Sequence, residues 1–339
     1  MTVSTREHDD AVASSSGLRV SVVMATCRRP DLLRRCLECL TAQSLDPSAY
    51  EIVVVDDGHT ASSRAVVEEF DALTRSSPNV RYFESVGTRG PAGARNVGWR
   101  NAKAPVIAFT DDDTAPDRHW LREGLAAIDS ERCAVSGRTV VPIEGELTDH
   151  ARMTQGLESA EFITANALVP RKLLEELGGF DERFTRPWRE DSDLHFRLLD
   201  SGVTIVRAPR AVVVHPVRPA PWGISLGQQA NSFFEALLFK KHPRAYRETV
   251  TPQVPWRYYF IVASIAAAIA FACAQMWTPA AIALAAAVLT VIEFAMRRLR
   301  STSSSRRHIA EMLTTSAIIP FLSIYWRLRG ALHFKVMFW

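Results

Sequence analysis

The stretch Val106-Ile107-Ala108-Phe109-Thr110-Asp111-Asp112-Asp113 joins an apolar run to three successive carboxylates. A protein core does not accommodate unpaired carboxylates, so these side chains must meet a cation or water. Mg²⁺ and Mn²⁺ take oxygen ligands and often share them with a substrate diphosphate. The stretch therefore predicts a buried strand that ends at a metal and phosphate site, although a solvated acidic turn would have the same composition because Asp is common in turns.

Strand and helix patterns alternate on the N-terminal side of this stretch. Runs rich in β-branched residues at 20–25 and 51–55, and a shorter run at 80–83, are each followed by a loop and then by a helical pattern. The third of these loops, at 87–98, is rich in glycine. Such alternation predicts an α/β fold with a parallel sheet, helices on both of its faces, and a ligand beyond the carboxyl ends of the strands.

Six short motifs between residues 19 and 215 resemble those of bacterial family 2 glycosyltransferases, which have the Rossmann-like GT-A fold. In chain order they are Ser-Val-Val-Met-Ala-Thr-Cys-Arg-Arg-Pro, Val-Val-Asp-Asp-Gly, Gly-Ala-Arg-Asn-Val-Gly, Phe-Thr-Asp-Asp-Asp, Gly-Gly-Phe-Asp-Glu and Arg-Glu-Asp-Ser-Asp-Leu. The chain departs from the family at 25–28, where Ala-Thr-Cys-Arg replaces the usual Pro-Thr-Tyr-Asn and removes a ring that could stack on a base. The resemblance implies transfer of a sugar from a nucleotide diphosphate to an acceptor.

The resemblance implies a metal site at the acidic stretch. Asp111 and Asp113 would be the ends of the family's DxD motif, with Mn²⁺ or Mg²⁺ bridging a carboxylate and the two phosphates. Asp112 would lie between them and belong to the nucleotide-binding set. His215 ends the apolar run at 211–214, where many relatives return a histidine to the metal, whereas an isolated histidine elsewhere is usually structural.

The other residues that the resemblance places at the nucleotide are Thr26, Arg28, Asp57, Arg89, Arg95 and Asn96. Asp57 would read the nucleobase, and the first loop would line the same pocket. The glycine-rich segment suits a diphosphate, because the backbone can approach closely and the arginines add positive charge. An ordinary helix start with surface arginines is the alternative.

A second acidic group precedes a helical pattern after residue 190. Plain N-terminal capping would explain such acids, which bond free amides and complement the helix dipole. In the family, however, this pair supplies the general base that must reach the acceptor hydroxyl. We expect Asp191 to be the base and Glu190 to be the second candidate. Trp188 is expected to form a floor for a sugar or lipid acceptor, or else simply to pack.

The C-terminal part contains apolar stretches of membrane-spanning length. Residues 258–277 carry no charge and residues 280–296 carry only Glu293, and about 20 apolar residues span a bilayer. Thr278-Pro279 is expected to form the turn of a helical hairpin. A third apolar stretch, 313–326, is shorter and is broken at Pro320, so we expect an interfacial or partly inserted helix at 309–328.

Charge indicates the topology and excludes one class of partner. Lys and Arg residues flank both ends of the apolar hairpin, which predicts a multi-pass protein of the cytoplasmic membrane with its catalytic domain facing the cytoplasm. The net charge of +3 and the pI near 8.7 then reflect a basic membrane end suited to anionic lipid. Nucleic acid is not an expected partner, because no motif for it is present. Five scattered cysteines fit a reduced cytosolic state.

The sequence thus predicts a polar, disordered segment at 1–17, a GT-A domain at 18–240 and a membrane-associated module at 241–339. The expected activity is metal-dependent, inverting transfer of a sugar from a UDP- or dTDP-linked donor to a lipid-linked or cell-envelope glycan acceptor. A degenerate domain that serves as a membrane scaffold or sugar-nucleotide sensor is the alternative. A haloacid dehalogenase-type phosphatase also uses an Asp-x-Asp pair, but the cluster lies on the fourth strand and Ala115 stands where that class has Thr or Val.

Overall fold

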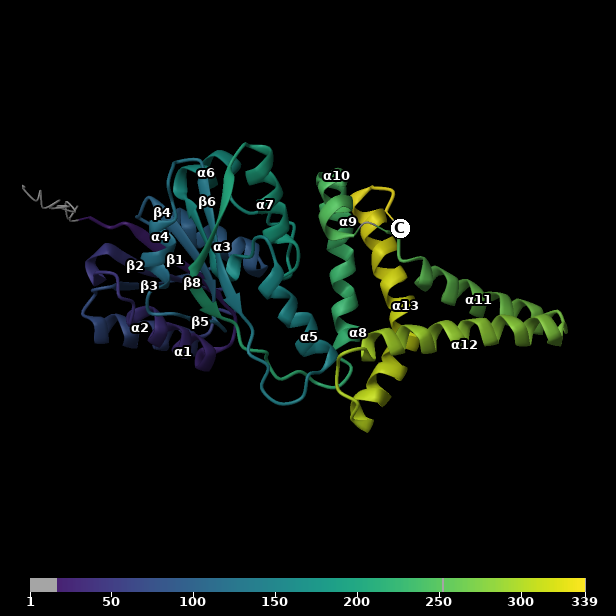
Figure 1. The fold of residues 1–339 in the computed structure, drawn as a ribbon. Helices are drawn as coiled ribbons and strands as arrows, with labels where there is room; N and C mark the ends of the chain where they lie inside the picture. Colours follow the sequence, from purple (N-terminus) through teal and green to yellow (C-terminus); the bar gives the residue numbers. More distant parts are fainter. Residues whose placement is uncertain (1–16, 252, 339) are drawn as a thin grey trace, which may run out of the picture.

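A computed structural model describes residues 17–251 and 253–338, with an α/β domain on one side and long C-terminal helices on the other (Figure 1). Apart from Gly17, the segment predicted to be disordered lies outside the described residues. The α/β domain is built on one eight-stranded sheet. Across the sheet its strands are β3 (Asn79–Glu84), β2 (Tyr50–Asp56), β1 (Val20–Thr26), β4 (Val106–Asp111), β7 (Ala167–Pro170), β6 (Cys133–Val140), β8 (Thr204–Val214) and β5 (Ala115–Pro116).

The parallel arrangement predicted for the first four strands is confirmed, because β1 pairs in parallel with both β2 and β4, and β2 pairs in parallel with β3. The rest of the sheet is mixed. Strand β7 is antiparallel to β4 and β6, β6 is parallel to β8, and β5 is antiparallel to β8. The carboxyl ends of β1, β2 and β4 therefore meet at one edge of the sheet.

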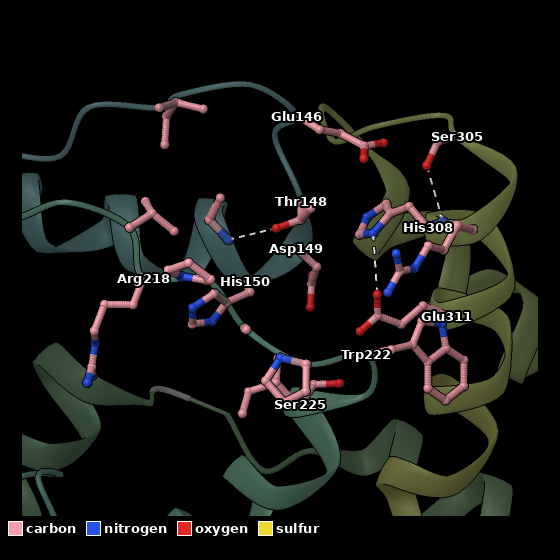
Figure 2. A pocket seen from close by; sticks show the side chains of 18 of the residues that line it. Glu146, Thr148, Asp149, His150, Arg218, Trp222, Ser225, Ser305, His308 and Glu311 are labelled. Carbon is pink, nitrogen blue, oxygen red and sulfur yellow. Dashed lines mark hydrogen bonds and ion pairs between the residues drawn. The ribbon is translucent and has the colours of Figure 1, made fainter. Parts of the chain in front are cut away.

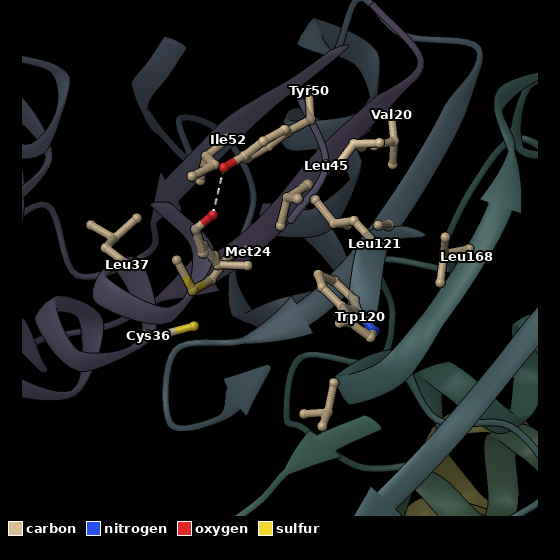
Figure 3. Close-up of a cluster of buried hydrophobic side chains, with 14 of the residues drawn as sticks. Val20, Met24, Cys36, Leu37, Leu45, Tyr50, Ile52, Trp120, Leu121 and Leu168 are labelled. Carbon is tan, nitrogen blue, oxygen red and sulfur yellow. Dashed lines mark hydrogen bonds between the residues drawn. The ribbon is translucent and has the colours of Figure 1, made fainter. Parts of the chain in front are cut away.

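Helices cover both faces of this sheet. The helices of the domain are α1 (Pro30–Thr41), α2 (Ala61–Thr74), α3 (Gly90–Asn101), α4 (Trp120–Ala126), α5 (Asp149–Gln155), α6 (Arg171–Leu177) and α7 (Glu190–Asp200), with single turns at η1 (Pro47–Ala49), η2 (Gly156–Ser159) and η3 (Thr164–Asn166). Since side chains alternate along a strand, neighbouring residues of β1 serve different cores. Met24 packs in the core beneath α1, α2 and α4 (Figure 3), whereas Val23 packs in the core beneath α3, α6 and α7.

Two glycines of α3 bring this helix close to its neighbours. A Cβ atom at Gly98 would lie 2.4 Å from Cγ1 of Val23, so only glycine allows α3 to approach β1 this closely. Gly90 has φ +80°, and a Cβ atom there would lie 2.4 Å from the carbonyl oxygen of Thr185. The first turn of α3 is therefore held against the loop that leads to α7.

The C-terminal helices differ from the predicted segments in three ways. They are α8 (Ile224–Gln228), α9 (Ser232–Lys241), α10 (Pro243–Ala245), α11 (Trp256–Cys273), α12 (Trp277–Leu299) and α13 (Arg306–Phe334), with one turn at η4 (Gln229–Asn231) and a π-helical turn at η5 (Tyr246–Val250). The hairpin does not turn at Thr278 and Pro279, which lie in the first turn of α12, where a proline costs no hydrogen bond. It turns earlier in the chain, around Gln275, which has φ +59°. Pro320 is buried within α13 and does not end the helix, which is longer than predicted.

Helix α9, which the sequence assigned to the catalytic domain, packs against α13. A Cβ atom at Gly330 would lie 2.4 Å from the carbonyl oxygen of Phe233, and Nζ of Lys240 donates a 2.7 Å hydrogen bond to the carbonyl of Phe334. Figure 1 shows α9 and α13 side by side, with the α11–α12 hairpin extending across them and away from the sheet.

Arg298, at the end of α12, connects the hairpin to the rest of the chain. Its guanidinium donates hydrogen bonds to hydroxyls of α13 and α8 and forms a 2.8 Å ion pair with Asp149 of α5. Only 10% of this side chain is exposed. One buried cation therefore joins α12, α13 and the α/β domain.

Candidate active site

Asp111, Asp113 and His215 form a cluster at the carboxyl end of β4. Each offers one ligand atom, and the three atoms all lie within 4.8 Å of one another. The sheet explains this meeting, because β5 pairs with β8 so that Ala115 lies opposite Val214, immediately beside His215. Two carboxylates and one imidazole are a donor set that suits Mn²⁺ or Mg²⁺, so the residues fit the metal that the sequence predicts.

Cations surround the two predicted metal ligands of β4. Burial raises the pKa of Asp111, but the guanidinium of Arg95 and the ring of His215 outweigh that effect and leave the pKa lowered. Nε of Arg218 lies 2.9 Å from Oδ2 of Asp113. Arg218 was not predicted from the sequence, although a basic residue three positions after His215, a candidate metal ligand, could have indicated a role at this site. The lowered pKa keeps Asp111 ionised, as a metal ligand must be.

Asp112 points away from this cluster into the protein. Its carboxylate accepts hydrogen bonds from Oγ1 of Thr26 at 2.8 Å and from Nη1 of Arg29 at 3.2 Å. Burial raises the pKa of Asp112 to about 6. Asp112 and Thr26 therefore fasten the acidic loop to the loop after β1.

Arg95 links the acidic stretch to the acids of α7. Its Nη2 donates to Oδ1 of Asp111 at 2.7 Å, and its Nη1 donates to Oε1 of Glu190 at 3.0 Å. The side chains of Arg95 and Glu190 are only 4% and 5% exposed. One guanidinium thus sets the distance between the predicted metal ligand and the predicted catalytic acids.

Glu190 and Asp191 begin α7 but differ in their partners. Burial raises the pKa of Glu190 to about 7, despite the opposing effect of Arg95. Burial also raises the pKa of Asp191. Oδ1 of Asp191 accepts the backbone N–H of Ser192 at 2.7 Å, and Oδ2 has no hydrogen-bond partner among the described residues. Each acid therefore keeps one carboxylate oxygen without a partner among the described residues, Oδ2 of Asp191 and Oε2 of Glu190, and the two differ in that Glu190 is ion-paired with Arg95.

Asp57 joins three loops at the carboxyl edge of the sheet. Oδ1 accepts a hydrogen bond from the Ser85 hydroxyl at 2.7 Å, and Oδ2 accepts the Gly90 amide at 3.0 Å. Arg28 lies beside it on the first loop, exposed and with φ +56°. A Cβ atom on Gly58 would come within 2.8 Å of Cγ of Arg28, so the loops after β1 and β2 touch.

Arg89 and Asn96 are not brought into this cluster by any contact that the structure records. Arg89 is exposed at the start of α3 and forms no hydrogen bond or ion pair with described residues. Asn96 is buried, and its amide bonds the backbone of Phe180, the indole of Trp99 and the carboxylate of Glu182. Asn96 thus holds the Gly-Gly-Phe-Asp-Glu loop against α3.

Trp188 connects the loop before α7 to α9. Its Nε1 donates a 2.7 Å hydrogen bond to Oε1 of Glu235, which also accepts Nε of Arg189 at 2.8 Å. The ring is partly buried against an apolar cluster that includes Phe184, Phe196 and residues of α9 and α13. Trp188 therefore positions the start of α7 against the C-terminal helices.

Comparison with known proteins identifies the family. The family model described as glycosyl transferase family 2 matches residues 21–183, and the one described as glycosyl transferase family group 2 matches residues 106–296, more than half of the chain. The chain belongs to glycosyltransferase family 2. The predicted family, the predicted GT-A fold and the predicted enzyme class are confirmed for this glycosyltransferase.

Several characterised proteins are similar to this glycosyltransferase. Glycosyltransferase AglE of Haloferax volcanii is 24% identical over 212 residues, which cover 59% of this chain and 67% of that protein. Pre-mycofactocin glycosyltransferase of Mycobacterium tuberculosis is 28% identical over 230 residues, which cover 63% of this chain and 46% of that protein. The chain thus spans about half the length of some of the relatives it matches.

The fold is shared with a solved structure. The mannosyltransferase PcManGT of Pyrobaculum calidifontis, determined in complex with GDP-Man and Mn²⁺, superposes with a TM-score of 0.59 over 93% of this chain and 88% of that chain. The sequences are 21% identical, so the similarity shows a common fold.

Proposed function

We propose that the protein is a metal-dependent, inverting glycosyltransferase that moves a sugar from a nucleotide diphosphate sugar to a lipid-linked or cell-envelope glycan acceptor at the cytoplasmic face of the membrane. The observation that carries this proposal is the buried connection from the Asp111, Asp113 and His215 cluster through Arg95 to the acids of α7. A UDP or dTDP donor follows from the sequence resemblance. PcManGT was solved with GDP-Man, so guanine nucleotides belong in the same test.

In the proposed reaction the acceptor oxygen attacks the anomeric carbon while Asp191 takes its proton. Attack on the face opposite the diphosphate inverts the configuration at that carbon. Asp111, Asp113 and His215 would hold the metal, which when bound neutralises the charge that develops on the leaving diphosphate. Arg95 and Glu190 would fix the separation between the metal site and the base.

The nucleotide would lie across the loops that Asp57 joins. Arg28 is exposed at this place and Arg89 is exposed immediately before α3, where the positive end of the helix dipole favours phosphate. Thr26, Asp112 and Asn96 are buried and bonded within the protein, which supports a role for them in shaping the site.

Three C-terminal helices are long and apolar enough to cross a membrane. We propose that α11 and α12 insert as a hairpin while α13 lies along the membrane surface. The exposed apolar residues of α13 recur at helical spacing along one stripe: Ile318, Phe321, Tyr325, Leu328 and Leu332. The course of α13 across the hairpin in Figure 1 supports this arrangement.

Sidedness follows from the two ends of the hairpin. The backbone N–H of Ser303, just after α12, donates a 2.8 Å hydrogen bond to the carbonyl of Leu147 in the α/β domain. Nε of Arg257, at the start of α11, lies 2.8 Å from Glu293 in the C-terminal part of α12, so the two ends of the hairpin lie together, which supports two crossings. Arginines at this end favour the cytoplasm.

The proposal is tested by thermal unfolding of the full chain in detergent with UDP, dTDP or GDP, with and without Mn²⁺. Only a ligand that binds the native state raises the midpoint. We expect one nucleotide to do so in the presence of Mn²⁺, and Asp113→Ala to abolish the shift. Asp117→Asn, which changes an exposed carboxylate four residues away, is the matched control and should retain it.

Measurement of donor hydrolysis completes this test. Slow, acceptor-independent hydrolysis of the matching nucleotide sugar should require Mn²⁺ and should disappear in Asp113→Ala. Nucleotide binding without any hydrolysis or transfer by membranes would instead support the sensor function.

A further inference from the structure

A pocket of about 460 Å³ lies where the α/β domain meets the C-terminal helices (Figure 2). Its walls come from three parts of the chain: residues 142–151 after β6, residues 216–228 after His215, and residues 305–312 at the start of α13. None of the residues predicted from the sequence to bind the nucleotide lines this pocket. It is therefore a second site beside the metal cluster.

The lining of this pocket disfavours an anion and suits a neutral, hydroxyl-rich ligand. Four carboxylates line it: Glu144, Glu146, Asp149 and Glu311. Asp149 is already paired with Arg298, and of the two arginines in the lining, Arg218 is already paired with Asp113. Carboxylates accept hydrogen bonds from sugar hydroxyls, and Trp222, with neighbouring prolines, offers an apolar surface for the C–H face of a sugar ring.

Two histidines of the pocket have ring nitrogens without partners. His308 of α13 is 3% exposed, and neither of its ring nitrogens forms a hydrogen bond with any described residue. Oε2 of Glu311 lies 3.9 Å from its Nδ1, too far for a hydrogen bond. Nδ1 of His150, on α5, is likewise buried without a partner in the described chain. Buried polar atoms normally have a partner, so these nitrogens point to a ligand that supplies hydroxyl groups.

The pocket also connects the metal cluster to the membrane helices. Arg218 contributes to its wall and contacts Asp113, and Pro216 follows His215 directly. The opposite wall is the first turn of α13, whose later turns carry the exposed apolar stripe. A ligand in this pocket would therefore lie between the bilayer surface and the reacting groups.

We propose that this pocket binds the sugar units of the acceptor, so that the acceptor is an uncharged glycolipid and not a lipid monophosphate. This inference rests on the proposed glycosyltransferase activity and specifies its acceptor class. A hydroxyl of the bound glycan would face the metal cluster while its lipid part remains in the membrane.

The test is photo-crosslinking of the full chain in nanodiscs. The probe is a glucosyl diacylglycerol that carries a diazirine on its sugar, and the comparison probe is farnesyl phosphate that carries a diazirine in its chain next to the phosphate. We expect the neutral probe to label peptides from 142–151 and 305–312, and excess unmodified glucosyl diacylglycerol to compete. His308→Leu should lower this labelling roughly tenfold, the effect of one lost hydrogen bond. His333→Leu, an exposed position on the same helix, should not change it.

His150→Leu provides a second variant, because His150 is less buried than His308 and its replacement disturbs packing less. Preferential labelling of the pocket by farnesyl phosphate, or undiminished labelling in both histidine variants, would overturn the inference. Mn²⁺-dependent hydrolysis of the donor separates this failure from failure of the proposed function. If hydrolysis persists while pocket labelling does not occur, only the acceptor assignment is wrong.

Discussion

Replacement of Arg95 by methionine should destabilise the protein in a manner that depends on pH. Methionine keeps most of the side-chain volume but removes the cation between Glu190 and Asp111. Because the Arg95 and Glu190 side chains are almost fully buried, loss of one partner leaves an unpaired charge that water cannot solvate. Breaking such a pair costs about 3–5 kcal/mol.

The sign of the pH dependence follows from Glu190. Burial already raises its pKa to about 7, above the value of about 4.3 for an unfolded glutamate. Loss of Arg95 removes an effect that lowers the pKa, so the folded pKa rises further. A raised folded pKa favours the native state at low pH and loses that contribution as pH rises. The variant should therefore show its full deficit near pH 8 and a smaller deficit near pH 6, where only the lost pair with Asp111 remains.

Thermal unfolding in detergent, followed by tryptophan fluorescence, measures this deficit. For a domain of this size about 1 kcal/mol corresponds to 2–4 °C, so we expect a fall of roughly 6–20 °C near pH 8 and a smaller fall near pH 6. The double variant Arg95→Met/Glu190→Gln should recover part of the loss, because no charge is then buried at position 190. An equal deficit at both pH values, or a double variant whose loss is the sum of the single losses, would refute the reasoning.

Asp191→Asn should retain Mn²⁺-dependent nucleotide binding but lose about 10²- to 10⁴-fold in transfer rate, because an amide cannot take the hydroxyl proton. If Glu190→Gln is inactive while Asp191→Asn is active, the general base is Glu190 and not Asp191. The wild-type rate should fall on acidification at a pH above the ordinary aspartate range, because burial raises the pKa of both acids and protonation removes the base; a rate that stays flat down to pH 5 would contradict this. A single cysteine at position 303 in a cysteine-free background should resist a membrane-impermeant reagent in intact cells, whereas one at position 278 should react. Labelling at position 303 from outside would reverse the topology.

The local patterns in the sequence predicted the first four strands of the domain but not the order of the other strands in the sheet. The β-branched runs and the loops that follow them predicted β1, β2, β3 and β4, because β1, β2 and β4 are largely buried and each loop carries its own turn chemistry. The mixed half of the sheet has no comparable local pattern. Its order depends on pairings between residues far apart in the chain.

The acidic motif likewise predicted a cluster but not the roles within it. Asp111, Asp112 and Asp113 are neighbours in sequence, yet the middle one faces the interior and the outer two face the cluster. The partners that decide this, Arg29 and Arg218, come from other loops. Trp188 could not be assigned to α9 for the same reason, since its partner lies 47 residues further along the chain. At the membrane end, hydropathy found the apolar stretches, while the position of the turn depended on where α12 could accept a proline.

The buried guanidinium of Arg298 has a consequence for how far the enzyme can reach. It is bonded at once to α5, α8 and α13, so the end of the hairpin and the catalytic domain share one junction. The height of the catalytic groups above the bilayer is then a fixed length of the molecule. Acceptors whose reactive hydroxyl lies at that height above the bilayer would be glycosylated. Shorter or longer acceptors of the same chemistry would not react.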